Sequence, residues 1–146
     1  MDSERIRQVA KELDGTLETK DVESIVSFFA DDCEIELLGT SVKGKEGARR
    51  WLRWQFGHVA EYQLVPVVIM IEENVFFEEF VVKAKLPNGT ALESRQAEVL
   101  VFDEDYKVNS LRLYFDRLDF ADAVAKDPVS RFAVRRLLRG SLKGLV

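Results

Sequence analysis

The chain has 146 residues, of which 47% are hydrophobic and 32% charged, and its formal net charge is −5 at pH 7. These values fit one globular domain with a full hydrophobic core, and they exclude a disordered or fibrous protein. One cysteine cannot form an internal disulfide, one histidine offers no metal cluster, and no apolar run is long enough to cross a bilayer. We therefore expect no bound metal or cofactor, and the lack of a signal-like N-terminus predicts a cytoplasmic protein.

Two helices are predicted at the start of the chain. Apolar residues recur at helical spacing along the first of them, at Ile6, Val9, Leu13 and Leu17. Asp21 stands where the N-cap of the second helix belongs. The buried face of this second helix is expected to comprise Val22, Ile25, Val26 and Phe29.

The stretch SIVSFFADDCEIELLG, residues 24–39, changes from helical spacing to strict alternation. Ile35 and Leu37 alternate there with glutamates, which predicts a short strand with Leu37 pointing into the protein. Gly44 then precedes a third helix with an apolar side. That side is predicted to contain Ala48, Trp51, Leu52 and Phe56.

Long strands rich in valine, isoleucine and phenylalanine are predicted from about residue 59 to residue 118. The sequence LPNGT (86–90) indicates a hairpin, because Asn-Gly tolerates positive φ in a tight turn. EEN (72–74) and DEDYK (103–107) mark two further reversals. Helices followed by an antiparallel meander predict an α+β fold, with the helices covering one face of a curved sheet.

Two closing helices are predicted after Asp119 and Asp127, the second with Pro128 at its favoured first position. Residues 126–146 hold six basic residues and one acid, a charge of +5, so the rest of the chain carries −10. We expect a basic helix at about 128–143 to pack on the acidic body or on a second subunit, and we expect neither nucleic acid nor a membrane as partner. With no linker or repeat, residues 1–146 are predicted to form a single domain.

Three stretches resemble the nuclear-transport-factor-2-like superfamily, which includes ketosteroid isomerases, SnoaL-like polyketide cyclases and limonene epoxide hydrolases. They are TKDVESIVSFFADDCEIEL (19–37), LPNGT, and KVNSLRLYFDRLDFADAV (107–124). The resemblance covers nearly the whole chain before the basic tail. It implies a cone-shaped, strongly bent antiparallel sheet wrapped around the N-terminal helices, with an apolar pocket inside, and it does not specify a reaction.

The positions that carry catalysis in ketosteroid isomerases are apolar here. By the resemblance, their proton-shuttling aspartate corresponds to Leu37, their oxyanion-hole tyrosine to Leu13, and their protonated aspartate to Ala97. A hydrocarbon side chain neither accepts a proton nor donates a hydrogen bond, so these three residues supply no acid–base chemistry.

The positions that carry catalysis in limonene epoxide hydrolases also hold mostly different residues here. The water-positioning tyrosine and asparagine correspond to Ile35 and Leu37, the arginine to Glu79, and its flanking aspartates to Val81 and Leu113. Opening an epoxide with water needs an acid at the epoxide oxygen and a base on the water, and these positions do not supply that pair.

Strand alternation indicates one polar residue that could face the pocket. If Ala97 and Val99 face the pocket, Arg95 does too, and a buried arginine needs a carboxylate or an anionic ligand. The family alignment favours Glu79 as its partner, whereas the apolar alternation along the same strand favours an inward Glu78. Arg95 with a glutamate could be an acid–base pair or a clamp for an anionic or carbonyl substrate. Alternatively it is a structural ion pair near the open end of the cone, or Arg95 reaches solvent past its apolar neighbours.

The opposite face of the sheet is predicted to carry a homodimer contact. Leu113 and Phe115 are placed inside, so Tyr114 faces outward, and Leu100 and Phe102 are expected to join it. Contacts on this face are common in the superfamily.

The sequence therefore predicts a SnoaL-like protein that binds a small hydrophobic molecule. The predicted ligand-binding residues are Leu13, Leu37, Trp51, Val81, Ala97, Val99, Leu113 and Phe115. Two alternatives stay open. One is an enzyme of isomerase, cyclase or epoxide hydrolase type that acts on a hydrophobic carbonyl or epoxide through Arg95 and Glu79, or Glu78. The other is a protein-interaction module.

Overall fold

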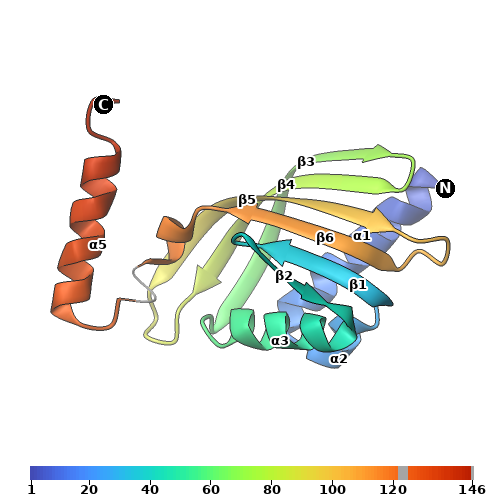
Figure 1. Ribbon diagram of the computed structural model, residues 1–146, viewed down its shortest axis with the longest axis horizontal. Coiled ribbons are helices and arrows are strands. Elements are labelled where there is room, and N and C mark those ends of the chain that lie inside the picture. Colours follow the sequence, from blue (N-terminus) through green and yellow to red (C-terminus); the bar gives the residue numbers. More distant parts are fainter. Residues whose placement is uncertain (122–124, 146) are drawn as a thin grey trace.

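A six-stranded curved sheet lies over three N-terminal helices in the computed structural model, which describes residues 1–121 and 125–145 (Figure 1). The elements are α1 (Ser3–Thr19), α2 (Val22–Val26), β1 (Phe29–Leu37), β2 (Thr40–Lys43), α3 (Gly44–Phe56), β3 (Glu61–Glu72), β4 (Val75–Lys85), β5 (Ala91–Phe102), β6 (Val108–Phe115), the 3₁₀ helix η1 (Arg117–Phe120) and α5 (Pro128–Ser141). This confirms the predicted α+β class and the cone-like wrapping of a sheet around helices.

The strand order is β2-β1-β6-β5-β4-β3. Every neighbouring pair is antiparallel except β1 and β6, which run parallel, so the sheet is not purely antiparallel as predicted. The β1–β6 pairing joins the first strand of the chain to the last. As a result α3, which follows β2, comes to lie against β1 on the concave side (Figure 1).

The second helix is shorter than the sequence suggested. Asp21 caps it as predicted, and its carboxylate accepts a hydrogen bond from the Ser24 amide at 3.2 Å. Phe29 does not belong to its buried face. This residue opens β1, because the Val108 amide already donates to the Phe28 carbonyl at 2.9 Å, and the buried Phe29 ring meets Trp51 edge-on.

β2 was not among the predicted strands. This short, mostly exposed strand pairs with the end of β1 after a tight turn at Leu38 and Gly39, whose φ angles are 54° and 74°. Positive φ at both central residues matches the right-handed twist of a hairpin. Leucine is unusual in that conformation, so the Leu-Gly sequence does not indicate a hairpin turn as Asn-Gly does.

The core fills the space between the helices and the concave face of the sheet. Its fully enclosed members include Ile6 on α1, Cys33 and Ile35 on β1, Leu52 on α3, and Val108 on β6. Burial raises the pKa of the Cys33 thiol, so this cysteine is a small core residue without thiolate reactivity at neutral pH.

Leu52→Ala is expected to destabilise the protein by about 2–5 kcal/mol, because it leaves a cavity at a fully buried site. Arg53→Ala is the matched control, since Arg53 is exposed on the same helix turn and alanine keeps the helix propensity. Chemical denaturation of both variants measures the difference. Equal stabilities would show that α3 does not pack as described.

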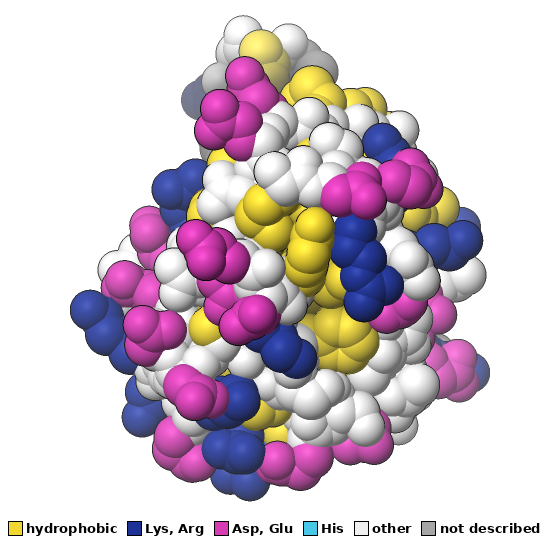
Figure 2. Space-filling view, turned by 90° about the vertical axis from the view of Figure 1, so that its right-hand side faces the viewer, with side chains coloured by type: hydrophobic (Ala, Val, Ile, Leu, Met, Phe, Trp, Pro, Cys, Tyr) yellow, Lys and Arg dark blue, Asp and Glu magenta, His cyan; other side chains and the backbone are white. Residues whose placement is uncertain are grey.

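The end of the molecule that carries the β3–β4 and β5–β6 turns shows charged side chains of both signs around a central group of hydrophobic ones (Figure 2). At the other end, η1 and the last turn of α3 lie close to the start of β3, and α5 stands beside the body (Figure 1). No residue of α5 is buried. None of the helices in the described part of the chain combines the length and apolar composition that a bilayer-spanning segment requires.

Candidate functional site

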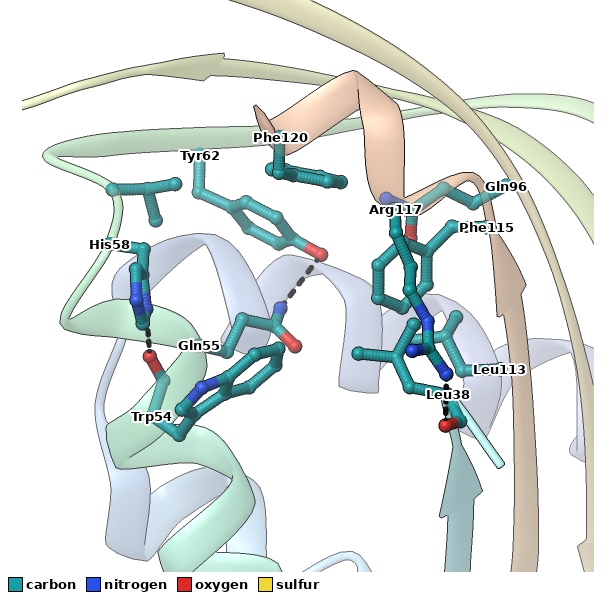
Figure 3. A pocket seen from close by; sticks show the side chains of 11 residues that line it. Leu38, Trp54, Gln55, His58, Tyr62, Gln96, Leu113, Phe115, Arg117 and Phe120 are labelled. Carbon is teal, nitrogen blue, oxygen red and sulfur yellow. Dashed lines mark hydrogen bonds between the residues drawn. The ribbon is translucent and has the colours of Figure 1, made fainter. Parts of the chain in front are cut away.

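A cavity of about 190 Å³ lies on the concave side, between the end of α3, the start of β3 and η1 (Figure 3). Its walls are mostly apolar. They are formed by Leu38, Trp54, Gln55, His58, Val59, Tyr62, Gln96, Leu113, Phe115, Arg117 and Phe120. Mostly apolar walls with a few polar groups are typical of small-molecule sites.

Tyr62 and Gln55 form the polar feature of this cavity. The Gln55 side-chain amide donates to the Tyr62 hydroxyl at 3.1 Å (Figure 3). The phenolic proton is therefore left to donate elsewhere, for instance to a ligand oxygen. Burial, and then the negative charge of Glu98, raises the pKa of Tyr62, so the phenol stays protonated throughout the physiological range.

The rim is closed by contacts between distant segments. The Arg117 guanidinium donates to the Leu38 carbonyl, which ties η1 to the β1–β2 turn, and Phe120 meets Phe115 edge-on with ring centroids 5.5 Å apart. Ser94 on β5 donates to the Asp119 carboxylate at 2.6 Å, which fixes η1 to the sheet as well. η1 thus forms one wall of the cavity.

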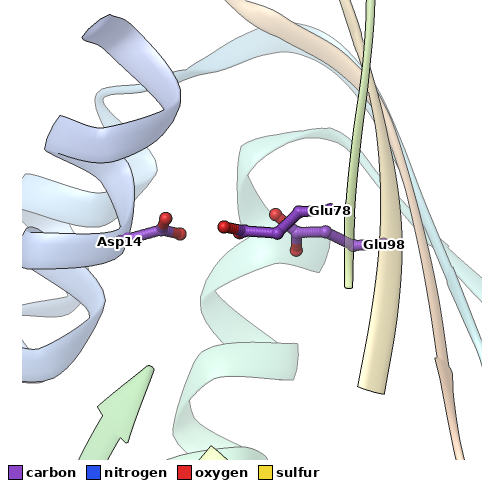
Figure 4. A group of neighbouring side chains, drawn as sticks. All are labelled: Asp14, Glu78 and Glu98. Carbon is purple, nitrogen blue, oxygen red and sulfur yellow. The ribbon is translucent and has the colours of Figure 1, made fainter. Parts of the chain in front are cut away.

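Three carboxyl groups gather in the interior: Asp14 from α1, Glu78 from β4 and Glu98 from β5 (Figure 4). Each offers an oxygen within 4.8 Å of the others. Glu78 and Glu98 are buried and Asp14 is half-buried, and one Glu78 carboxylate oxygen, Oε1, has no hydrogen-bond partner. None of the ion pairs among the described residues involves these groups.

The pKa values of all three carboxyls are raised. Burial, followed by the negative charge of Glu78, raises the pKa of Asp14 from 3.8 to about 8. Burial raises the pKa of Glu78 to about 7, and it raises that of Glu98 well above its usual range, with repulsion from Asp14 and Glu78 adding to the effect. Near pH 7 the cluster therefore holds both protons and negative charge.

The donor set of this cluster is made of oxygen atoms only. Carboxylate oxygens suit Mg²⁺ or Ca²⁺, whereas zinc and iron sites usually include histidine or cysteine. Within the described residues, the cluster contains neither histidine nor cysteine. Protons offset the mutual repulsion of these groups without any metal, which makes the cluster a candidate for acid–base chemistry.

The cluster is linked to the cavity through neighbouring residues on β5 and β6. Glu98 pairs with Leu113 across β5 and β6, and it follows Gln96 by two positions on the same face of β5. Leu113 and Gln96 both line the cavity, as does Tyr62, whose pKa responds to the charge of Glu98. The three carboxyl groups do not line the cavity themselves, and these neighbours connect the cluster to it.

The expectation that Arg95 and Glu79 face the pocket is wrong. On β4 and β5 the buried positions are even-numbered, so these two residues lie on the outer face of the sheet. They do form the predicted ion pair, at 3.5 Å, but the Arg95 side chain is 79% exposed. Glu78 is the inward glutamate, as the apolar alternation along β4 indicated.

Val81, Ala97 and Val99 share that outer face and do not line the cavity. The same reversal moves Leu100 and Phe102, expected on the dimer face, into the core.

The remaining predicted ligand-binding residues divide into two groups. Leu113 and Phe115 line the cavity, although binding of a ligand by them stays a prediction. Leu13, Leu37 and Trp51 are core residues outside the cavity lining. Leu37 packs in the interior of the protein and does not contact the cavity.

Asp14 and Glu98 were missed by sequence reasoning. Asp14 directly follows an apolar stripe residue, and the helical pattern gives no sign that its side chain turns inward. Glu98 could have been found, because antiparallel partners lie on the same face of a sheet. With the hairpin at 86–90 in place, Glu78 pairs with Glu98, so an inward Glu78 requires an inward Glu98.

A family model of the SnoaL-like domain matches residues 9–110, more than half of the chain. The chain belongs to the SnoaL-like family. The match includes most of α1 and all of β4 and β5, and hence all three carboxyls of the interior cluster. A search of curated proteins finds no match for this SnoaL-like chain.

Two solved structures share the fold of this SnoaL-like protein. One is SalBIII, an epoxide hydrolase/cyclase-like enzyme with a role in pyran ring formation in the polyether salinomycin. It is 18% identical, with a TM-score of 0.72, over 81% of this chain and 95% of SalBIII. The other is an NTF2-like protein of unknown function from Exiguobacterium sp. 255-15. It is 16% identical, with a TM-score of 0.60, over 72% of this chain and 92% of that protein. At these identities the likeness shows the fold alone.

Proposed function

We propose that this SnoaL-like protein is an acid–base enzyme that binds a small apolar molecule in the cavity and opens an epoxide ring in it. The observation that carries the proposal is the group Asp14, Glu78 and Glu98. These are buried carboxyls with raised pKa values beside an apolar chamber. Three carboxyls that face one another in the interior repel when ionised, and such groups with raised pKa values gather at functional sites more often than at purely structural ones.

The cavity favours a small ligand. Its volume of about 190 Å³ is below the roughly 300–1,000 Å³ of sites that hold drug-sized molecules. Burying apolar surface against Leu113, Phe115 and Phe120 supplies the binding energy, while the Tyr62 hydroxyl orients the one polar atom of the ligand. The expected substrate is a compact hydrocarbon skeleton with a single oxygen function.

Epoxide opening needs a proton donor at the ring oxygen and a base for the attacking hydroxyl or water. Glu98, whose pKa burial raises well above its usual range, is the neutral acid, and Tyr62, which lines the cavity, is a second donor. Asp14 and Glu78 share negative charge near pH 7 and provide the base. SalBIII, a structural neighbour, is described as epoxide hydrolase/cyclase-like, which supports an epoxide as the first substrate class to test.

The proposal is tested with a panel of apolar epoxides of increasing size, with and without an internal hydroxyl group. Binding is followed by thermal shift and product formation by mass spectrometry. A ligand at ~100 times its dissociation constant stabilises the folded state by about 2.7 kcal/mol, which is easily detected. Turnover of a bound epoxide supports the proposal. Binding without turnover would make the protein a carrier, and an absence of binding throughout the panel would contradict the proposed site.

Leu113→Trp is expected to abolish ligand binding, because the larger ring fills the cavity that Leu113 lines. Tyr114→Trp is the matched control, since Tyr114 is the next residue on β6 and points to the opposite face, where it is exposed. The shift in melting temperature caused by the ligand should vanish in the first variant and persist in the second. Unchanged binding by Leu113→Trp would place the ligand elsewhere.

A further inference from the structure

The C-terminal helix α5 packs little of its surface on the rest of the chain. It stands at one end of the molecule (Figure 1), and none of its residues is buried. Its apolar side chains are exposed to water, with Val129 77%, Phe132 61% and Leu137 59% exposed. Proteins rarely leave so much apolar surface open unless a partner covers it. The acid–base site makes no use of this helix.

The charges of α5 are all of one sign. Its 14 residues include four arginines and no acid, and Asp127, which caps the helix, is the last acidic residue of the sequence. None of the ion pairs among the described residues involves an arginine of α5. Negative charge that would pair with these arginines must therefore come from another molecule.

The apolar and basic residues of α5 lie on different sides of the helix. At about 100° per residue, half of the circumference is occupied by an apolar side, made of Val129, Ala133, Val134, Leu137 and Leu138. Arg136 borders this apolar side at one edge and Arg131 at the other, each about 20° from the nearest apolar residue. The other two arginines lie on the opposite, basic side together with Phe132.

Two serines also lie within the apolar side. The Ser130 hydroxyl donates to the Asp127 carboxylate, and the Ser141 hydroxyl donates to the Leu138 carbonyl. Both hydroxyl protons thus have acceptors inside the chain, so the apolar side can leave water without orphaning a donor.

We infer that α5 lies on the surface of a bilayer that contains anionic phospholipids, with its apolar side at the acyl boundary and its arginines at the lipid phosphates. A helix of 14 residues is too short to cross a bilayer, which takes about 20. Burying the apolar side brings Arg131 and Arg136, at its edges, to the level of the phosphates. The charges are complementary, because residues 126–146 carry +5 and anionic lipids give the surface a negative potential.

The rest of the chain carries −10, which an anionic surface repels. Salt screens charges beyond about 8 Å at physiological ionic strength, and the place of α5 at one end of the molecule lets the helix meet a surface ahead of the body (Figure 1). The sequence alone predicts a helix packed on protein and no membrane partner. The exposed apolar side and the arginines at its edges favour a bilayer.

A place at the bilayer also suits the cavity, and this part of the inference rests on the proposed function. Apolar epoxides partition from water into the bilayer, so a protein held there meets them at a raised local concentration. Binding to vesicles requires no epoxide. Its outcome is therefore separate from the outcome of the epoxide panel.

The test is flotation of the full-length chain with lipid vesicles in the absence of any ligand. We expect binding to phosphatidylcholine vesicles in which about a third of the lipid is phosphatidylserine, and binding weaker by about tenfold or more to phosphatidylcholine alone. Added salt should weaken binding to the anionic vesicles. No binding to the anionic vesicles, or equal binding to both kinds, would overturn the inference.

Leu137→Gln, at the centre of the apolar side, should weaken binding to the anionic vesicles by about tenfold or more, because the bilayer no longer buries a leucine there. Phe132→Gln is the matched control on the basic side of the same helix and should change binding by less than about threefold. Arg136→Gln, at the edge, should weaken it by roughly fivefold. Equal effects of Leu137→Gln and Phe132→Gln would overturn the inference.

The same variants identify a different partner if there is one. Their melting temperatures should stay within about 2 °C of the unmodified chain, since no residue of α5 is buried. In sedimentation velocity without vesicles, a dimer that Leu137→Gln dissociates would assign the apolar side to a second copy. Binding to duplex DNA that Leu137→Gln leaves unchanged, without binding to vesicles, would assign the basic side to nucleic acid. Either result would overturn the inference.

Discussion

Glu78→Gln is expected to lower the turnover number by about 10²–10⁴-fold while the protein remains folded. Glutamine has nearly the same shape but neither gives up nor accepts a proton, so the base formed with Asp14 is lost. Its amide can donate to the Asp14 carboxylate, and the buried site therefore tolerates it. The measurement is the steady-state rate on whichever epoxide the panel identifies, together with the melting temperature.

Glu79→Gln is the control for this experiment. Glu79 is the next residue in the chain but lies on the outer face, paired with the exposed Arg95. Its loss should change the rate by less than about threefold, because exposed ion pairs contribute little. Should the two variants have equal activity, the interior carboxyls are not the acid–base group.

The stability of the protein is expected to decrease as the pH rises from about 5 to 8. Asp14 has a pKa of 3.8 when unfolded and about 8 when folded, and Glu78 changes from 4.5 to about 7. Between these values the folded chain binds more protons than the unfolded chain, so raising the pH favours unfolding. For each proton that the folded chain binds in excess of the unfolded chain, the free energy of unfolding falls by about 1.4 kcal/mol per unit rise in pH.

This decrease is measured as the melting temperature at intervals from pH 5 to pH 8, at constant ionic strength. Glu78→Gln should flatten the profile, because it removes one group that titrates in this window together with the negative charge that helps to raise the pKa of Asp14. The exposed carboxyls with lowered pKa values, such as Asp21 and Asp31, act below about pH 4 and do not affect this window. A melting temperature that rises with pH in the unmodified chain would contradict the raised pKa values.

Much of the fold was predictable because its local signals agree with one another. Asp21 caps a helix, Gly44 begins one, and the turn at residues 86–90 lies where Asn-Gly indicated. The parallel pairing of β1 with β6 was not predictable in this way. It depends on contacts between residues far apart in the chain, and local periodicity holds no information about them.

The site was predicted less well than the fold, for a reason that lies in β5. Its second half, Val99 to Phe102, is apolar on both faces, so alternation does not reveal which face is inside. Its first half buries Ser94, Gln96 and Glu98, whereas Arg95 is exposed and Ala97 is half-buried. A rule that puts apolar residues inside chooses the wrong face there, because the interior of this protein is polar where the candidate chemistry lies.

The parallel pairing also has a consequence for how the chain folds during synthesis. Phe29 pairs with Val108, 79 positions later, and β6 lies between β1 and β5. Until β6 has left the ribosome, the β1–β2 hairpin has no strand to join, and the meander of β3, β4 and β5 ends in an open edge. Such long-range closure slows folding and leaves that edge exposed to other chains. We therefore expect the sheet to be completed only when β6 pairs with both β1 and β5.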